Sequence, residues 1–306
     1  METTPNSDNS GAAPAEQLRV GVVGAGPWAR LVHAPMFAYH PGTRLVGVWA
    51  RRPEAAADVA SSHDARAFAS FDEMLDEVDA VAFAVPPDVQ AEMGVTAARA
   101  GKPLLLEKPV ALDLDAAQRL VDAVDEAGVL TQVLLTWRYA PAVRAFFDEV
   151  ASIESPLVGG RGQFLGGGSL AGPFATPWRL EHGPLPDLGP HVVDALDAAL
   201  GHVTGVRAHG DPQRWVGLLL EHETGVVSEV SMTASSPLLP VRAGIEVYTE
   251  AGVVEVDTAT AVGPDAITNV VDEFVATAQG TPHPLDVHHG LHLQTVLEAA
   301  RRDLTS

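Results

Sequence analysis

A polar triplet, Glu107-Lys108-Pro109, directly follows the apolar run Leu104–Leu106. Open α/β sheets bind their ligands at the carboxyl ends of such buried strands. Lys108 is one of 2 lysines among the 19 lysine and arginine residues of the chain, so lysine is kept here where arginine is otherwise preferred. Only lysine can become a neutral amine on desolvation. Lys108 is therefore a candidate for proton transfer or for polarising a carbonyl, and a surface lysine before a turn proline is the alternative.

A second polar group comprises Asp187, His191 and Asp194, whose spacing of i, i+4 and i+7 places them on one face of a helix. Pro190 has no amide hydrogen, so we expect it in the first turn, with Asp187 as the earliest possible N-cap and the helix running to Leu200. His191 could then meet a substrate hydroxyl with carboxylates beside it. The alternative is that Asp187 caps the helix and His191 makes a buried hydrogen bond.

A glycine-rich motif follows the apolar run Leu18–Gly24, and it reads Gly24-Ala25-Gly26-Pro27-Trp28-Ala29. It fits the pattern G-x-G-x-x-[GA] of dinucleotide-binding loops. Gly24 would make the tight turn, Gly26 would let the backbone approach a pyrophosphate, and Ala29 would allow close helix packing. The alternative is an ordinary turn that needs a positive φ.

An arginine pair ends the expected second strand, which reads Trp49-Ala50-Arg51-Arg52. An NAD site usually has an acid here to hold the ribose 2′-hydroxyl, but the first acid is Glu54. Guanidinium groups match the geometry of a phosphate. We therefore predict NADP as cofactor, with NAD possible, and ordinary solvated arginines as the alternative.

The elements that must position these residues divide the chain into two parts. Apolar segments alternate with alanine-rich helical stretches up to Thr136, which predicts an N-terminal Rossmann domain with a doubly wound parallel sheet. The expected strands are Leu18–Gly24, Arg44–Ala50, Asp79–Val85, Pro103–Leu106 and Val129–Leu135, and the expected helices include Asp88–Ala100 and Asp113–Ala127.

Beyond Thr136 the strands cluster, which predicts a C-terminal α+β domain with a mainly antiparallel open sheet. The expected strands are Gly205–His209, Trp215–Glu221, Gly225–Thr233, Val241–Tyr248 and Gly252–Val256, with a glycine-rich segment at Val158–Gly168 and closing helices at Ile267–Gln279 and His288–Arg302. The predicted organisation is a disordered tail (1–17), a dinucleotide-binding domain (18–136) and a domain for substrate binding and oligomerisation (137–306).

Composition excludes several classes of protein. The net charge of −21 repels nucleic acid and anionic membranes. Without cysteine the chain has no disulfide, thiolate nucleophile or cysteine-ligated metal. No apolar run is long enough to span a bilayer, and the N-terminus lacks the pattern of a signal peptide, so we expect a cytoplasmic protein.

The E-K-P triplet, the segment Asp187-Leu188-Gly189-Pro190-His191 and the glycine loop together resemble the glucose-fructose oxidoreductase and inositol dehydrogenase family (Gfo/Idh/MocA). The first resembles the E-K-P signature of that family, and the second resembles its D-x-G-x-H segment, with Asp194 at the usual following acid. The resemblance implies that Lys108 and His191 border the nicotinamide and assist proton transfer, and that Asp187 contacts substrate.

Further positions follow from the same resemblance. Arg138, Trp178 and Arg179 are expected in the substrate cleft, Pro86 and Glu107 beside the cofactor, and relatives usually pair as dimers or tetramers through the open sheet. The chain departs from the family where T-P-N-x-x-H is common, because residues 85–90 read Val-Pro-Pro-Asp-Val-Gln.

The predicted function is hydride transfer between a nicotinamide and a carbinol or carbonyl carbon of a sugar, polyol or related small metabolite. A noncatalytic nucleotide-binding sensor or partner-binding protein is the alternative. A methyltransferase is disfavoured, because it normally needs an acid where Arg51 stands. Metal ligation by His288, His289 and His292 has the right spacing, but we expect these histidines to be a solvent-facing cluster and predict no metal site.

Overall fold

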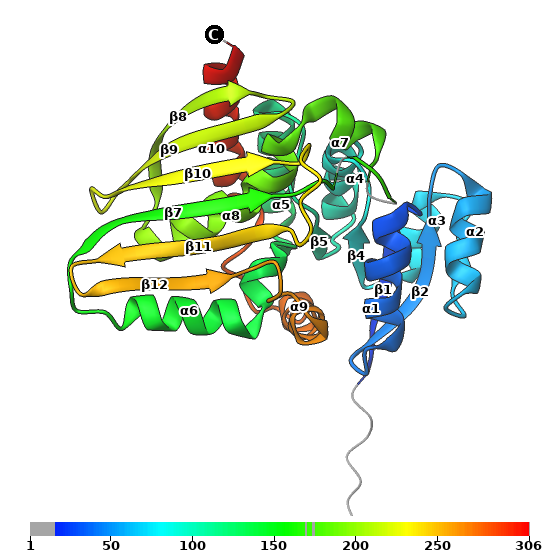
Figure 1. The fold of residues 1–306 in the computed structure, drawn as a ribbon. Coiled ribbons are helices and arrows are strands. Elements are labelled where there is room, and N and C mark those ends of the chain that lie inside the picture. Colours follow the sequence, from blue (N-terminus) through cyan, green and yellow to red (C-terminus); the bar gives the residue numbers. More distant parts are fainter. Residues whose placement is uncertain (1–15, 169, 173–174, 306) are drawn as a thin grey trace, which may run out of the picture.

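The computed structural model describes residues 16–168, 170–172 and 175–305. Its core consists of two six-stranded sheets with helices packed against them (Figure 1). The predicted tail lies outside the described residues except for its last two positions. Within the part described, no helix is long and apolar enough to cross a membrane.

The first sheet is parallel throughout, with the order β3-β2-β1-β4-β5-β6. Its strands are β1 (Leu18–Val23), β2 (Thr43–Trp49), β3 (Arg66–Ala67), β4 (Ala80–Phe83), β5 (Leu104–Leu106) and β6 (Thr131–Val133). The strand order reverses between β1 and β4, which creates the crevice where doubly wound sheets bind ligands. The predicted Rossmann architecture is confirmed.

Helices connect these strands, and several carry the expected terminal residues. They are η1 (Ala29–His33), α1 (Ala34–Tyr39), α2 (Pro53–Ser61), α3 (Phe71–Glu77), α4 (Pro87–Arg99) and α5 (Leu114–Ala127). The side chain of Asp113 caps α5 by accepting from the amide of Ala116, and Gly128 ends the helix in the left-handed conformation.

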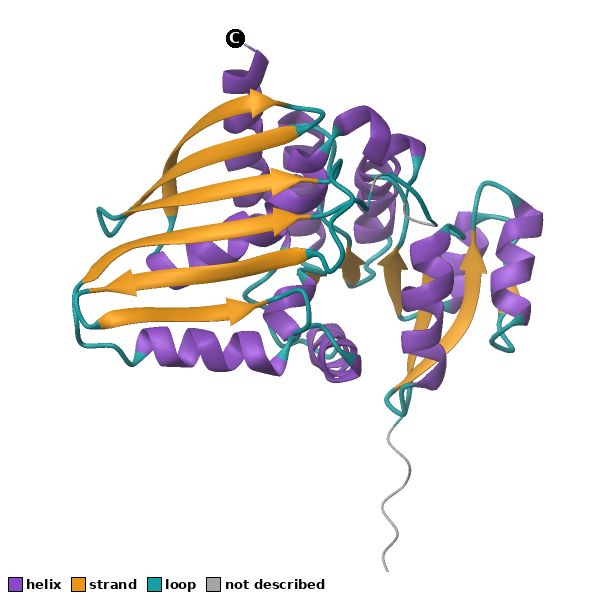
Figure 2. Cartoon of the chain, viewed as in Figure 1, coloured by secondary structure: helices purple, strands orange, loops and turns teal. Residues whose placement is uncertain are grey.

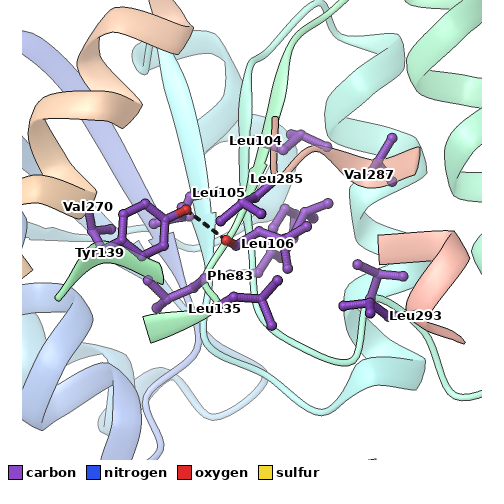
Figure 3. Packing of buried hydrophobic residues seen from close by; sticks show 14 of the residues in the cluster. Phe83, Leu104, Leu105, Leu106, Leu135, Tyr139, Val270, Leu285, Val287 and Leu293 are labelled. Carbon is purple, nitrogen blue, oxygen red and sulfur yellow. Dashed lines mark hydrogen bonds between the residues drawn. The ribbon is translucent and has the colours of Figure 1, made fainter. Parts of the chain in front are cut away.

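The core around β5 joins segments from both ends of the chain (Figure 3). Leu104–Leu106 are fully buried, and the hydroxyl of Tyr139 donates to the carbonyl of Val133 at 2.9 Å. The amide of Val133 in turn donates to the carbonyl of Leu285 at 2.7 Å. The C-terminal segment therefore packs directly on the first sheet, although it was expected to belong only to the second domain.

The second sheet has the order β12-β11-β7-β10-β9-β8, and every neighbouring pair is antiparallel except β7 with β10. Its strands are β7 (Leu157–Leu165), β8 (Val203–Asp211), β9 (Trp215–His222), β10 (Val227–Thr233), β11 (Arg242–Thr249) and β12 (Gly252–Asp257). The predicted mainly antiparallel sheet is confirmed.

The glycine-rich segment forms β7, a central strand that the sequence analysis did not identify as one. A Cβ at Gly160 would lie 2.6 Å from Leu200 Cδ1, and a Cβ at Gly162 would lie 2.4 Å from Val192 Cγ1. Val192 and Leu200 both belong to helix α8 (Pro184–Leu200). The glycines therefore serve close packing of that helix on the sheet, which offsets their weak strand propensity.

Helices cover one face of the second sheet and leave the other uncovered among the described residues (Figure 2). These later helices are η2 (Thr136–Tyr139), α6 (Pro141–Ala151), α7 (Pro177–His182), α8 (Pro184–Leu200), α9 (Pro264–Ala278) and α10 (Val287–Thr305). Strand β9 shows the resulting alternation, because Leu218 is buried whereas its neighbour Leu219 is exposed.

Helix α8 begins one turn earlier than predicted, at Pro184 rather than at Asp187, and contains Pro190 in its interior. Gly183, with φ of 72°, separates it from α7. Pro184 is suited to the first turn because it needs no amide partner. Pro190 removes only the helical bond to the carbonyl of residue 186, so the packed helix continues through it.

Candidate active site

A cavity of about 490 Å³ lies at the carboxyl ends of β1, β4 and β5, and its opposite wall comes from β7, β10, α7 and α8. Of the predicted residues, those that line it are Gly26, Pro27, Trp28, Pro86, Glu107, Lys108, Trp178, Arg179, Asp187 and His191. Three stretches that are far apart in the sequence thus meet in one place, as the motifs required.

Lys108 is the centre of the polar contacts. Its Nζ atom donates to Asp187 Oδ1 at 3.0 Å and to the backbone carbonyl of Asp187 at 2.6 Å. Arg179 Nε donates to the other carboxylate oxygen of Asp187 at 2.8 Å. Burial alone raises the pKa of Asp187, but the charges of Lys108 and Arg179 and their hydrogen bonds lower it to about 2. Asp187 is therefore a carboxylate near neutral pH and holds both cations in place.

His191 lies one helical turn beyond Asp187, in apolar surroundings. Its ring stacks on Trp137 with centroids 5.4 Å apart, and its Nδ1 atom is buried without a hydrogen-bond partner among the described residues. Burial lowers the pKa of His191 well below its ordinary value, and the positive charge of Lys108 adds to this effect. The imidazole is therefore neutral near pH 7 and has hydrogen-bonding capacity left for a ligand.

Glu107 faces the glycine loop. Trp28 Nε1 donates to Glu107 Oε1, and His33 Nε2 lies 2.8 Å from the same oxygen. This carboxylate thus connects the E-K-P triplet to the start of the first helical segment.

Gln90 is a site-supporting residue that the sequence analysis did not recognise as such. Its fully buried side chain accepts from the amide of Glu107 and donates to the carbonyl of Glu107, both at 2.8 Å. It stands where the resembled family has histidine, so the departure at residues 85–90 still supports the triplet. The sequence carried a signal for this role, because the glutamine lies at the start of α4, which follows β4 at the ligand-binding edge of the sheet.

The glycine loop has the space that a dinucleotide needs. Gly24 has φ of 122°, and a Cβ there would lie 2.3 Å from the carbonyl oxygen of Ala84. At Gly26, by contrast, a Cβ would meet no atom within 4 Å, so the backbone is open to a ligand. Ala29 is fully buried, as close helix packing requires. These residues fit a bound pyrophosphate.

Other predicted residues do not line the cavity. Arg51 and Arg52 are exposed just after β2. They lie beside the glycine loop, since the amide of Gly24 donates to the carbonyl of Trp49.

Arg138 also lies outside the cavity and pairs with Asp194 at 2.8 Å, and the same carboxylate oxygen lies 2.7 Å from His289 Nε2. Asp194 therefore belongs to a separate network behind the site, and Arg138 is not placed as a substrate contact.

The three histidines considered as metal ligands from the sequence do not converge on one point. His289 pairs with Asp194, His292 with Asp197, and His288 with Asp286 and Asp125.

Residues 18–135 match the model of the Gfo/Idh/MocA oxidoreductase family, which is described as having an NAD-binding Rossmann fold. The N-terminal part of the chain thus matches the Rossmann portion of this family.

Two named relatives are similar over less than half of the chain. UDP-N-acetylglucosamine 3-dehydrogenase of Acidithiobacillus ferrooxidans is 35% identical over 127 residues, which cover 42% of this chain and 40% of that protein. Inositol 2-dehydrogenase of Rubrobacter xylanophilus is 36% identical over 142 residues, which cover 45% of this chain and 41% of that protein. The chain spans roughly half the length of the curated relatives that it matches.

Among solved structures, GenD2 from gentamicin A biosynthesis, crystallised in complex with NAD, is similar over the whole length. The TM-score is 0.85 at 25% identity, and the match covers 100% of this chain and 98% of that chain. The likeness to this structure thus includes the second sheet as well as the Rossmann sheet.

The pKa of His191 yields a test. We expect its imidazole resonance in an NMR titration to stay at the neutral position as pH falls from 8 through the ordinary histidine pKa of about 6.5, because burial and Lys108 disfavour the charged form. Since the unfolded chain takes up this proton more readily, His191 should also reduce stability as pH falls below about 6.5. A His191 resonance that moves to the charged position around pH 6.5 would contradict the assignment.

Proposed function

We propose that this chain is an NAD(P)-dependent dehydrogenase or reductase that acts on a CH–OH or carbonyl group of a sugar, polyol or related small metabolite. The observation that carries the proposal is the position of Lys108, which is held by Asp187 beside a neutral His191 in a cavity that begins at the glycine loop. The polar groups at one end and the apolar walls suit a small hydroxylated ligand.

The residues present fit a nicotinamide dinucleotide. The open backbone at Gly26 and the adjoining start of the helical segment would hold the pyrophosphate, and Pro86 and Glu107 line the path toward Lys108. When bound, the nicotinamide supplies or accepts the hydride.

In the oxidation direction, Lys108 hydrogen-bonds the substrate oxygen and stabilises the negative charge that develops there. The hydroxyl proton passes to the neutral imidazole of His191 as the C–H electron pair leaves with the hydride, and a carbonyl forms. In reduction the same proton returns to the oxygen. Asp187 keeps Lys108 and Arg179 in position, and Trp178, whose buried Nε1 has no hydrogen-bond acceptor among the described residues, is placed to donate to a substrate oxygen.

The cofactor preference is a finer proposal. Arg51 and Arg52 follow β2 with no acid between the glycine loop and them, and their exposed side chains lie near where the 2′-position of the adenosine ribose is expected. A pair of guanidinium groups favours the phosphate of NADP over the hydroxyl of NAD.

Self-association is proposed through the uncovered face of the second sheet. Three exposed apolar side chains, Leu219 on β9, Val227 on β10 and Tyr248 on β11, point to this face. A second copy of the chain, related by a two-fold axis, would cover the same patch on both partners and form a dimer, or part of a tetramer. The cytoplasmic location stays a prediction.

Lys108→Ala tests the catalytic assignment. We expect kcat to fall by roughly 10²- to 10³-fold, because the cation that stabilises the charge developing on the substrate oxygen is lost, while the affinity for NADPH measured by fluorescence changes little. Lys102→Ala is the matched control, since the side chain of the other lysine donates to the carbonyl of Val78 and does not line the cavity, so kcat should be unchanged. If no nicotinamide nucleotide binds to the wild type, the proposed function is wrong. Unchanged turnover in Lys108→Ala would show that Lys108 has a noncatalytic role.

Arg51→Ala combined with Arg52→Ala tests the cofactor preference. Loss of one charged hydrogen bond, worth about 1.5–3 kcal/mol, predicts a Kd for NADPH that is weaker by at least roughly 10- to 100-fold, and little change for NADH. Arg99→Ala combined with Arg119→Ala, both at exposed positions, controls for the same change in net charge. Equal weakening of both cofactors, or tighter binding of NADH by the wild type, would contradict a preference for NADP.

Leu219→Glu tests the proposed interface. A charge inside the patch that dimerisation would bury should shift a dimer toward monomer. Association measured by sedimentation equilibrium should weaken by at least about tenfold, equivalent to roughly 1.4 kcal/mol. Leu239→Glu, at a side chain that is 93% exposed in the loop after β10, is the control. A wild-type chain that is monomeric at high concentration would rule the interface out.

A further inference from the structure

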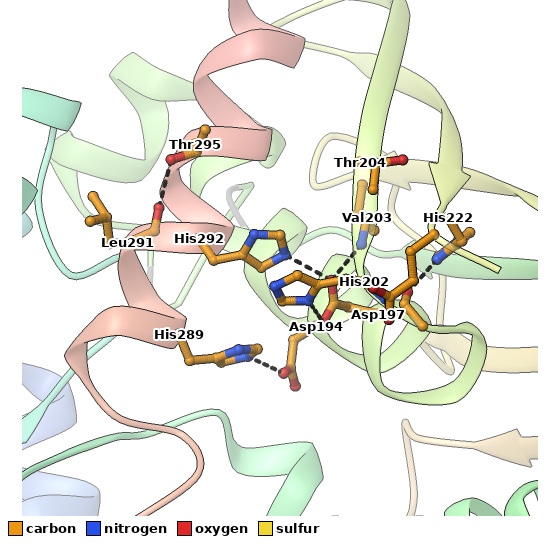
Figure 4. A network of polar contacts seen from close by, with 12 residues as sticks. Asp194, Asp197, His202, Val203, Thr204, His222, His289, Leu291, His292 and Thr295 are labelled. Atoms are coloured by element: carbon orange, nitrogen blue, oxygen red, sulfur yellow. Dashed lines mark hydrogen bonds and ion pairs between the residues drawn. The ribbon is translucent and has the colours of Figure 1, made fainter. Parts of the chain in front are cut away.

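Three metal-ligating side chains meet at the C-terminal end of α8 (Figure 4). Asp197 lies in the last turn of α8, His202 in the connection to β8, and His292 on α10. One potential ligand atom from each residue lies within 4.8 Å of the other two. None of the three was selected for catalysis or cofactor binding, and only His292 was in the histidine trio considered from the sequence.

Both imidazoles direct a nitrogen at the same carboxylate. His292 Nε2 lies 2.7 Å from Asp197 Oδ1, and His202 Nδ1 lies 3.1 Å from Asp197 Oδ2. The two rings are stacked, with centroids 3.9 Å apart and an interplanar angle of 15°. The two rings thus present one nitrogen each to the same carboxylate, and imidazole nitrogen is the commonest metal ligand in proteins.

The carboxylate is held in place. Asp197 Oδ1 also accepts from the amide of Val203 at 2.8 Å. A rigid anionic oxygen next to two imidazole nitrogens is a donor set for a borderline cation rather than for Mg²⁺ or Ca²⁺, which prefer oxygen ligands.

We propose that Asp197, His202 and His292 bind a divalent first-row transition metal of the zinc type. Tetrahedral Zn²⁺ with bonds of ~2.1 Å separates its ligand atoms by about 3.4 Å, so the observed nitrogen–oxygen distances require shifts below about 1 Å. The ring nitrogens that now face the carboxylate become the ligands, and their protons move to the opposite nitrogens. Since His202 is 54% exposed, it can rotate out of the stack, and water can occupy the fourth position.

Binding would join two helices that the chain otherwise packs through side chains. The metal would link the end of α8 to α10 through bonds that the unfolded chain does not preform. Because the first half of α8 carries Asp187 and His191, the same helix would be anchored at one end by the ion pairs of the cavity and at the other by the metal. The proposal concerns a site that does not depend on hydride transfer.

The experiment uses the full chain, freed of metal with a chelator and then titrated with ZnCl₂ by calorimetry and with CoCl₂ by visible absorption. We expect one ion per chain, the intense absorption of a tetrahedral Co²⁺ site, and a rise in the thermal midpoint with free Zn²⁺, because the ion binds the folded state. His202→Ala should weaken Zn²⁺ binding by at least about tenfold and abolish that Co²⁺ spectrum.

His209→Ala is the matched control, because it removes an exposed histidine of the same strand region and should leave both titrations unchanged. His202 is half-exposed, so its replacement should preserve the fold, and circular dichroism of the metal-free variant checks this. His292→Ala provides a second ligand deletion. If the wild type shows no saturable 1:1 binding, or if His202→Ala binds Zn²⁺ as tightly as His209→Ala does, the proposal is overturned and the cluster is a hydrogen-bonded network only.

Discussion

The ion pairs of Asp187 with Lys108 and Arg179 are the interaction on which the architecture of the site depends. Lys108 follows β5 of the first sheet, Arg179 lies on α7, and Asp187 belongs to α8, which packs on the second sheet. Removing charges from water costs several kcal/mol, and buried ion pairs often fail to recover more than that cost. This cluster is therefore better understood as positioning the lysine than as stabilising the chain.

The same cluster helps to explain how one helix can present a carboxylate and, one turn later, a neutral imidazole. Burial disfavours a charged His191, and the cations that favour the ionised Asp187 add to this effect.

Much of this arrangement could be predicted from local sequence, because it depends on short-range rules. The apolar run before Gly24 and the alternation of strands and helices were sufficient to place the parallel sheet and its ligand-binding edge. The convergence of Lys108, Asp187 and His191 was inferred from the resemblance of three motifs and from strand ends, and the structure places all three in one cavity.

Other features depended on tertiary contacts that local rules do not describe. The strand β7 is rich in glycine because α8 lies close above it, so its local propensity pointed away from its structure. Pro190 was expected to mark the start of a helix, but packing on both sides keeps α8 intact through it. Arg138 was expected in the cleft and instead neutralises Asp194, because the periodicity that places residues 187, 191 and 194 on one face does not say how deep each lies. The pairing of His202 with His292 joins positions 90 residues apart, and no spacing rule connects them.

Helix α8 unites these observations, since it carries three buried carboxylates along its length and each is matched by a different set of cations or histidines. Asp187 is held by Lys108 and Arg179, Asp194 by Arg138 and His289, and Asp197 by His202 and His292. In a chain with a net charge of −21, three acids on one buried helix would repel one another unless each had its own partners. Their partners follow β5, precede β8 or lie on η2, α7 and α10, so the requirement to pair each charge also fixes how the parts of the chain pack. The geometry of the cavity and the packing around α8 are in this sense set by the same electrostatic constraint.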